Sequence, residues 1–498
     1  MSKKIIVIGI DAFDFNQLTL FKENLPNFTK LQKINPDIRM TSVFPPDSIP
    51  AWGSIYTGLN PAEHGAINFM DAKDDKSKIN FRDLHKYYKG RTFWDKASEQ
   101  GKKVCIMLPF SIYPPWQVNG VMVCRTLDVV NEDFPLKTYP EDIYEKFGLS
   151  DFNVNLFHGF PSKRNLKKYI ESMRKRTEAE AKLGLRFLEK YDADLYFIYF
   201  SALDAIQHTF WNYYDEKHPD YPGENPYKNI IKDFYVLFDK ILGDYLNRID
   251  DDTSVIVISD HGHGMRPVNL VNINEILRLK GYLHPVKKSK IENPFNQKEK
   301  IKKSLSNVIA TFGLGNFTLK LLSKFTLWKK VLASPSYIDF NRTVAYVSDL
   351  SGIKSYSQGG IIINKDVDGV EYENIRNKII GELKEIIDPK TGRNLMKWIV
   401  KREELYEGKY LNRYPDILFE LESDYGVGWS IYDSIIGKSS MSSFQPGSHM
   451  KDSPIFLVSK LGGIYIKKNI LLMDIGDIIL ELITEIQTEF PTIDFRMK

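Results

Sequence analysis

The sequence has 498 residues, which is enough to bury a large hydrophobic core in one domain with insertions or in two or three domains. Its 68 lysine and arginine residues nearly balance its 64 aspartate and glutamate residues, so the net charge of +4 gives no indication of a nucleic-acid polymer as a partner. Two cysteines, Cys105 and Cys124, are too few for a disulfide framework or a zinc finger, and both lie in apolar stretches typical of buried free thiols.

The chain begins with a predicted β-strand, residues 5–10, which ends at Asp11. This apolar run is too short for a secretory signal and lacks a small-residue cleavage site. No apolar stretch reaches the roughly 18 to 20 residues needed to span a bilayer, so we expect a cytoplasmic protein without a transmembrane segment. A lone aspartate after a strand is commonly a turn residue or a helix cap, and the alternative is a metal ligand.

A proline-rich segment, residues 44–50, precedes a predicted helix and contains Ser48. Ser48 lies where this helix would begin, which is an ordinary position for an N-cap serine. The start of a helix also offers backbone N–H groups and a positive dipole to an anion. Ser48 is therefore alternatively a nucleophile that a metal ion activates.

Apolar runs alternate with longer polar stretches of helical spacing through the first half of the chain. The runs are residues 5–10, 104–108, 121–124, 195–200 and 255–258, and the helical stretches include 165–190 and 229–248. Such alternation predicts an α/β fold with a mostly parallel, doubly wound sheet.

Acidic and histidine residues follow several of these runs. Asp204 and His208 are four residues apart, so they share one face of a helical turn. Asp260 and His261 come directly after the run 255–258, and His449 precedes an apolar run at 455–458. A lone loop histidine such as His449 is usually exposed, yet open α/β sheets expose their chemistry at strand ends. Together these residues predict a metal site at one edge of the sheet.

The composition changes after residue 282. Residues 287–330 are rich in lysine, have apolar residues at helical spacing and carry no cluster of metal-ligand residues. They fit a membrane-surface helix or, more commonly, a surface helix of a cap or of a subunit contact. Strand-like pieces return within 343–422 around a charged helix at 370–387. We expect residues 1–284 and 436–498 to form a catalytic core and residues 285–435 to form an inserted cap.

Five landmarks occur along the chain in the order of a known family. They are Asp11 after Gly9-Ile10, the Ser48 segment running on to His64-Gly65, Asp204 with His208, Asp260-His261-Gly262, and Gly447-Ser448-His449. This set resembles the type I phosphodiesterase and nucleotide pyrophosphatase family of the alkaline phosphatase superfamily. The resemblance implies an alkaline-phosphatase-like α/β/α sandwich with a mostly parallel central sheet and inserted cap segments.

The resemblance also implies roles for individual residues. Asp204, His208 and His449 would hold one divalent metal ion, and Asp11, Asp260 and His261 would hold a second. Ser48 would bridge toward the second ion as the nucleophile, where the family commonly has threonine. Ligands that combine histidine and aspartate without thiolate favour zinc, with manganese as the substitute.

Two further residues are candidates for substrate binding. Family members place an asparagine just after the His-Gly pair of the nucleophile helix, and Asn68 lies one residue short of that spacing. His263 follows the Asp260-His261 pair closely and would line the pocket.

The implied function is metal-dependent hydrolysis of small-molecule phosphoric esters, namely phosphodiesters or nucleotide pyrophosphate bonds, through a covalent phospho-serine. Two ions about 4 Å apart can stabilise both the attacking and the leaving oxygen in such a reaction. Alternatives within the superfamily are a phosphomonoesterase, a phosphonate hydrolase or a phosphomutase. A sulfatase is disfavoured because no arginine follows Pro50 at the sulfatase spacing, and a non-catalytic binding protein is disfavoured because every expected ligand position is filled.

Overall fold

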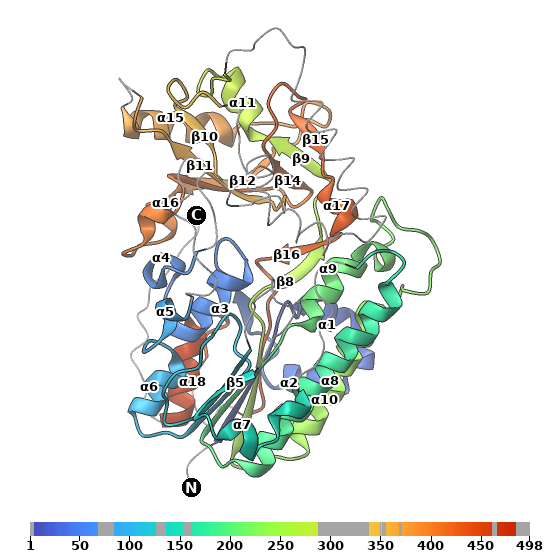
Figure 1. The fold of residues 1–498 in the computed structure, drawn as a ribbon. Coiled ribbons are helices and arrows are strands. Elements are labelled where there is room, and N and C mark those ends of the chain that lie inside the picture. The colour runs from blue at the N-terminus through green and yellow to red at the C-terminus, as the bar shows by residue number, and fades with distance from the viewer. Residues whose placement is uncertain are drawn as a thin grey trace.

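The computed structural model describes residues 4–67, 84–125, 136–152, 161–286, 338–348, 350, 355–367, 371–460 and 466–484. These residues form a lower unit, in which helices cover both faces of a central sheet, and an upper unit built on smaller sheets (Figure 1). None of the helices in the described part is both long and apolar enough to cross a membrane.

The central sheet has seven strands in the order β17-β7-β1-β6-β3-β4-β5. Its strands are β1 (Lys4–Ile10), β3 (Val104–Met107), β4 (Gly120–Arg125), β5 (Leu136–Tyr139), β6 (Leu195–Phe200), β7 (Thr253–Ile258) and β17 (Phe456–Val458). The inner pairs are parallel, whereas β5 and β17 run antiparallel at the two edges. Continuous apolar runs suit these strands because both faces of the sheet are buried.

Each face of the central sheet packs against its own set of helices. Alternate residues of β1 divide between the two cores: Ile6 and Ile8 belong to one, and Ile5 and Val7 to the other. One face carries α1 (Phe15–Phe21), α2 (Pro26–Ile34), α8 (Leu166–Lys190), α9 (Ala202–Tyr214) and α10 (Ile230–Leu246). The other carries α3 (Ser48–Thr57), α5 (His85–Tyr88), α6 (Phe93–Glu99) and α18 (Asp474–Thr484).

The sequence of α10 shows why such segments become helices. Its buried residues recur three and four positions apart: Ile231, Phe234, Tyr235, Phe238, Ile241, Leu242 and Tyr245. That spacing gives one apolar stripe, which packs against α9 and α2.

The upper unit contains a four-stranded antiparallel sheet and a three-stranded sheet. The first, in the order β10-β11-β13-β12, consists of β10 (Ala345–Val347), β11 (Gln358–Ile363), β12 (Met396–Lys401) and β13 (Ile417–Leu421), with α15 (Tyr372–Lys384) against β12. The second, in the order β14-β9-β15, consists of β9 (Asn269–Asn272), β14 (Tyr425–Gly428) and β15 (Ile436–Lys438), with α11 (Ile273–Leu279) against β14. Both sheets contribute to one further hydrophobic core.

Short elements join the two units. A two-stranded ribbon of β8 (Gly262–Met265) and β16 (Gly447–Met450) lies between them (Figure 1). The remaining short elements are β2 (Arg39–Thr41), paired with β18 (Asn469–Leu471), and the helices α4 (Pro61–His64), α7 (Ile143–Lys146), α16 (Arg402–Leu405) and α17 (Met441–Phe444).

One local expectation needs correction, and another cannot be compared with the described residues. Ser48 is the first residue of α3 and Asp47 holds the N-cap position, so Ser48 is not the cap. Residues 287–330 lie outside the described part of the chain.

Candidate metal centre

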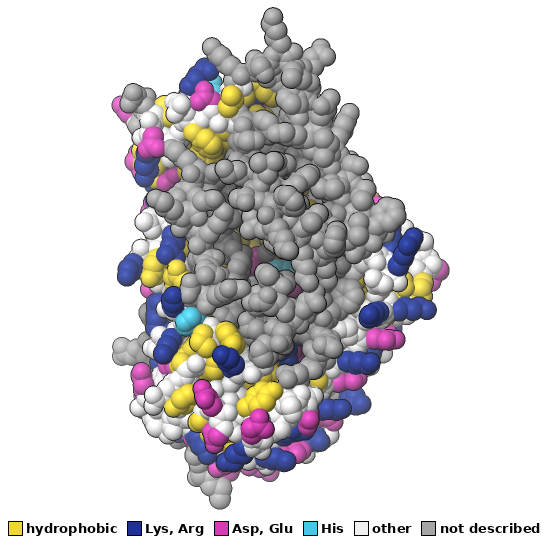
Figure 2. Space-filling view, viewed as in Figure 1, with side chains coloured by type: hydrophobic (Ala, Val, Ile, Leu, Met, Phe, Trp, Pro, Cys, Tyr) yellow, Lys and Arg dark blue, Asp and Glu magenta, His cyan; other side chains and the backbone are white. Residues whose placement is uncertain are grey.

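Three adjacent parallel strands, β6, β1 and β7, end at the same edge of the central sheet. Asp11 follows β1, Asp204 lies in the first turn of α9 just after β6, and Asp260 with His261 follows β7. His449 reaches this edge on β16. Parallel topology therefore gathers the predicted residues at the carboxyl ends of the strands. Figure 2 shows acidic and histidine side chains near the middle of this face.

A first cluster contains Asp11, Asp260 and His261, each with a ligand atom close to the others. Nε2 of His261 lies 3.2 Å from Oδ2 of Asp260 and 3.6 Å from Oδ1 of Asp11. The hydroxyl of Ser48 lies 3.2 Å from the same Nε2 atom. The structure thus places Ser48, at the start of α3, directly beside this cluster.

A second cluster contains Asp204, His208 and His449. Oδ1 of Asp204 lies 3.3 Å from Nε2 of His208 and 3.4 Å from Nε2 of His449. The two imidazole Nε2 atoms are themselves 2.9 Å apart. The ring of His449 also stacks on that of His261, with 3.7 Å between the ring centroids, so the two clusters are contiguous.

The three imidazoles of these clusters share one orientation. Nδ1 of His208 lies 2.9 Å from the carbonyl oxygen of Gly447, that of His261 lies 3.0 Å from Gly262 O, and that of His449 lies 2.8 Å from Pro46 O. Because a carbonyl only accepts, each Nδ1 is the donor and each Nε2 keeps its lone pair. All three lone pairs point into the centre, which is the arrangement that metal-binding histidines need.

Several carboxylate oxygens in the centre have no hydrogen-bond partner within the described residues. They are Oδ1 of Asp11, Oδ1 of Asp204 and Oδ2 of Asp260, and all are buried. Buried polar atoms without partners are rare because desolvation is costly. Divalent ions would satisfy these oxygens, so the residues fit two metal ions by the chemistry of their donors.

The electrostatics of these side chains support the same conclusion. Burial, followed by repulsion from Asp260 and Asp204, raises the pKa of Asp11 well above its usual range. Burial likewise raises the pKa of Asp260 well above its usual range. Burial lowers the pKa of His208 to about 3, so its ring is neutral and able to bind an ion near neutral pH.

Four residues that support the centre were missed by sequence analysis. The Tyr199 hydroxyl donates to Oδ2 of Asp11 over 2.5 Å, and the Trp52 indole donates to the same oxygen over 3.2 Å. The buried Arg266 donates over 2.8 Å to Gly447 O, the carbonyl that also accepts from His208. The Tyr356 hydroxyl, from the upper unit, lies 3.3 Å from Nδ1 of His449. None carries a local sequence signal, because each acts through residues distant in the chain.

The two predicted substrate-binding residues have different outcomes. Asn68 lies outside the described residues. His263 is on β8, opposite His449 in the ribbon, and its Nδ1 lies 3.6 Å from Oδ1 of Asp204.

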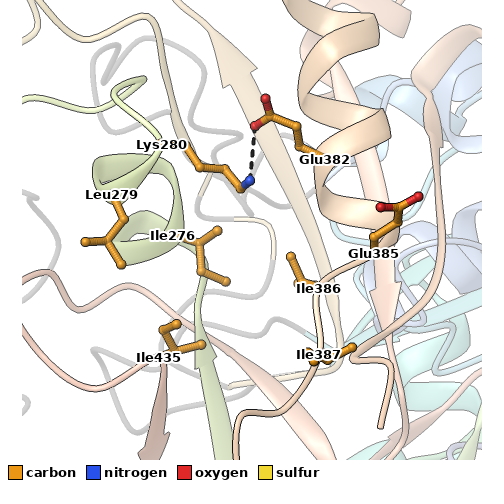
Figure 3. Close-up of a pocket in the computed structure, with 8 residues that line it drawn as sticks. All are labelled: Ile276, Leu279, Lys280, Glu382, Glu385, Ile386, Ile387 and Ile435. Atoms are coloured by element: carbon orange, nitrogen blue, oxygen red, sulfur yellow. Dashed lines mark ion pairs between the residues drawn. The ribbon is translucent and has the colours of Figure 1, made fainter. Parts of the chain in front are cut away.

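A shallow pocket of about 560 Å³ lies in the upper unit, between α11 and α15 (Figure 3). Mostly aliphatic side chains line it, and Lys280 and Glu382 form an ion pair of 3.3 Å at its edge. None of its lining residues belongs to the Asp/His clusters, so this pocket is separate from the candidate metal centre.

Comparison with known proteins identifies relatives at the level of family and fold. The family model described as type I phosphodiesterase / nucleotide pyrophosphatase matches residues 5–433. A phosphonoacetate hydrolase from Sinorhizobium meliloti 1021, solved with phosphonoformate, shares 13% identity and a TM-score of 0.53, over 97% of this chain and 95% of that one. A murine ectonucleotide pyrophosphatase / phosphodiesterase 5 in complex with AMP shares 13% identity, with a TM-score of 0.47 and the same coverage of both chains. Comparison with curated proteins gave no match. The predicted α/β/α fold is confirmed.

Proposed function

We propose a reaction for this chain, which belongs to the type I phosphodiesterase / nucleotide pyrophosphatase family: hydrolysis of phosphodiesters or nucleotide pyrophosphate bonds through a covalent phospho-serine. Membership of the family makes it a phosphoric-ester hydrolase of the alkaline phosphatase superfamily. The observation that carries the finer proposal is the position of Ser48, whose hydroxyl lies 3.2 Å from His261 at the start of α3.

The side chains of the centre would form two sets of metal ligands. Asp204, His208 and His449 would hold one divalent ion, and Asp11, Asp260 and His261 would hold the other. When bound, two such ions neutralise the charge that develops on the attacking and leaving oxygens. Zinc suits these ligands best, and manganese is the expected substitute. A cytoplasmic location stays a prediction of the sequence.

Ser48 carries the covalent step. Its Oγ attacks phosphorus as the bond from phosphorus to the leaving oxygen breaks, and the serine proton leaves on the released alcohol or nucleotide. The phosphoryl group stays on Ser48 as a phospho-serine that keeps the remaining ester substituent. Water then hydrolyses the phospho-serine and restores the hydroxyl. The N–H groups of Ser48 and Ile49 lie in the first turn of α3, at the positive end of its dipole, where they would donate to a phosphoryl oxygen.

Replacement of Ser48 by alanine tests this route. We expect turnover to fall by at least about 1,000-fold, because a covalent nucleophile is lost. The free energy of unfolding should change by only about 1 kcal/mol, which is typical for one hydroxyl. Ser54→Ala is the matched control, since Ser54 is a buried serine of the same helix that bonds to His64 outside the clusters. Near-normal turnover of Ser48→Ala with both ions bound would rule out the phospho-serine.

The leaving group can be tested on the full-length protein loaded with zinc or manganese. Bis-p-nitrophenyl phosphate, p-nitrophenyl phosphate and a p-nitrophenyl nucleotide ester should be compared, and we expect the diester and the nucleotide ester to react fastest. Phosphonoacetate belongs in the series because the neighbour of similar fold is a phosphonoacetate hydrolase. A preference for the monoester or for phosphonoacetate would replace the proposed substrate class by one of the alternatives.

A further inference from the structure

His263 is a buried histidine whose ring has no hydrogen-bond partner among the described residues. Only 2% of its surface is exposed, and neither Nδ1 nor Nε2 makes a hydrogen bond. Its three histidine neighbours in the centre each bond a backbone carbonyl through Nδ1. A buried imidazole without a hydrogen-bond partner destabilises the folded state, because its desolvation is not compensated. We therefore expect the ring to bind a group other than the described residues.

The orientation of the His263 ring is fixed from several sides. Its backbone N–H donates to Oδ2 of Asp14 over 3.1 Å, and β8 pairs with β16 so that His263 lies opposite His449. The ring packs edge-on against His208, with 4.6 Å between centroids, and beside Trp211 at 5.6 Å. The residue facing Nε2 is Gly447, where a Cβ atom would lie only 2.4 Å from this nitrogen. Nδ1 is therefore the nitrogen that faces Asp204.

Three imidazole nitrogens surround one carboxylate oxygen that has no hydrogen-bond partner in the described chain. Oδ1 of Asp204 lies 3.3 Å from His208 Nε2, 3.4 Å from His449 Nε2 and 3.6 Å from His263 Nδ1. Ligand atoms about 2.0–2.1 Å from a tetrahedral zinc ion lie about 3.3 Å from one another. All three separations are near that value. The ligand atoms of Asp204, His261 and His263 also lie within 4.8 Å of one another, and Asp204 is shared with the separate group that contains His208 and His449.

We propose that His263 is a further ligand, through Nδ1, of the metal ion at Asp204. This assignment rests on the proposed two-ion function and replaces the substrate-lining role expected from the sequence. It adds a ligand to the set that the family resemblance implies.

Metal binding to His263→Gln and His263→Ala tests the assignment without reference to activity. Metal-free protein should be titrated with zinc against a competing chelator, and the number of bound ions should be measured after dialysis. We expect one ion to bind as in the wild type and the other to bind more than about 100-fold more weakly, beyond the 10–100-fold typical of losing a residue that only supports a ligand. The melting temperature of each metal-free variant shows whether the fold is retained.

His218→Gln is the matched control. His218 is also buried, at 3% exposure, and its Nε2 lacks a hydrogen-bond partner within the described residues, but it belongs to none of the Asp/His groups. The His218→Gln protein should bind both ions with wild-type affinity. Cobalt loading gives a second readout, because the visible absorption of cobalt changes with its coordination number. Wild-type affinity at both sites, or a smaller loss with an unchanged cobalt spectrum, would overturn the assignment of His263.

A measurement on the wild type does not depend on any variant folding. Nitrogen NMR of protein labelled in histidine distinguishes a metal-bound Nδ1 from a metal-bound Nε2. We expect one histidine to bind through Nδ1 and the other ligating histidines through Nε2. Finding only Nε2-bound rings would overturn the proposal for His263 while leaving the proposed function intact. Wild-type protein that binds fewer than two ions would instead contradict the proposed function itself.

Discussion

Two aromatic side chains orient the carboxylate of Asp11. The Tyr199 hydroxyl and the Trp52 indole both donate to Oδ2, and Oδ1 then points toward His261. The two rings also pack edge-to-face, with centroids 5.1 Å apart, which restricts both donors. Burial and the nearby Asp11 charge raise the pKa of Tyr199 well above its usual range, so it remains a donor at any ordinary pH. One carboxylate oxygen is thus held for the protein and one is left for an ion.

Tyr199→Phe should weaken metal binding while keeping the packing of the ring. Loss of the hydroxyl frees Asp11 to rotate, and we expect about 10–100-fold weaker binding of one ion. Tyr196→Phe is the control, because Tyr196 lies on the same strand and its hydroxyl donates to Tyr191 O, away from the clusters. Zinc titration of both variants measures the difference. Equal affinity in Tyr199→Phe and the wild type would show that this hydroxyl does not position Asp11.

At the scale of elements, the ribbon of β8 and β16 builds much of the centre. It places His263 opposite His449 and brings Gly447 O to both His208 and Arg266. Neither strand has a strong sequence signal, because each is only four residues long and rich in glycine and histidine. Glycine is required at Gly447, where a Cβ atom would lie 2.4 Å from Gln207 O and from His263 Nε2.

Gly447→Ala should therefore disturb both stability and metal binding. Overpacking at this site should lower the free energy of unfolding by about 1–3 kcal/mol. The displaced carbonyl should also weaken the ion at Asp204, since it bonds His208. Gly381→Ala is the control: it lies in α15, where a Cβ atom would meet nothing within 4 Å, and it should be neutral or slightly stabilising. Unfolding and zinc titration of both variants measure these effects, and wild-type behaviour of Gly447→Ala would contradict the expected clash.

We propose that the inserted unit, which the sequence predicts at residues 285–435, begins near residue 269. Strand β9 pairs with β14 and β15, and α11 packs on β10 and β14, so residues 269–279 share the upper core. Hydrogen exchange should show the amides of β9 opening together with those of β14 rather than with those of β7. Protection of β9 that follows β7 would return the boundary to residue 285.

At the scale of the molecule, the two units meet around the Ser48 loop and the centre. The Tyr406 hydroxyl accepts from the N–H of Phe44, and the Tyr414 hydroxyl donates to the carbonyl of the same residue. Tyr356 reaches His449 from the upper unit. The upper unit therefore holds both the loop before the nucleophile and one proposed ligand, so the two units contribute to one site.

Ion binding should stabilise the whole protein in a pH-dependent manner. The raised pKa values of Asp11 and Asp260 mean that the metal-free fold holds these protons at higher pH than the unfolded chain. The protonated carboxyl groups contribute fully to the stability of the metal-free fold below about pH 4, their pKa in the unfolded chain. This contribution is lost as the pH rises through their higher pKa values in the folded chain. His208, with its pKa lowered to about 3, acts oppositely: its contribution is present above about 6.5 and is lost as pH falls toward 3.

The ions must displace the carboxyl protons, so their effect should be larger at high pH. We expect zinc to raise the melting temperature more at pH 8 than at pH 5.5, and binding to release protons at the lower pH. Melting curves with and without zinc measure the rise in melting temperature. Calorimetry in buffers of different ionisation enthalpy measures the number of protons released. The Ser48→Ala protein is a useful control, because it keeps all six of the Asp and His ligands that the family resemblance implies. An equal rise in melting temperature on adding zinc at both pH values would contradict the assignment of Asp11 and Asp260 as metal ligands.

Local patterns along the sequence predict the sheet and most of the proposed ligands. Apolar runs buried on both faces read as strands, and residues directly after parallel strands necessarily meet at one edge, which is why Asp11, Asp204 and Asp260 could be grouped in advance. The family resemblance added specific roles for His449 and Ser48, whose local patterns are ordinary. Each of these inferences depends on residues close together in the chain or on a known order of motifs.

The side chains that support the centre, and the directions of their rings, become known from the folded structure alone. Tyr199 bonds to Asp11 across 188 positions, and Tyr356 meets His449 across 93. Such contacts depend on side-chain direction after the chain has folded back on itself, and no local pattern encodes that direction. His263 is a further example. Its position two residues after His261 predicts that it lies near the site. The direction of its Nδ1 atom, which faces Asp204 and has no hydrogen-bond partner among the described residues, depends on the pairing of β8 with β16.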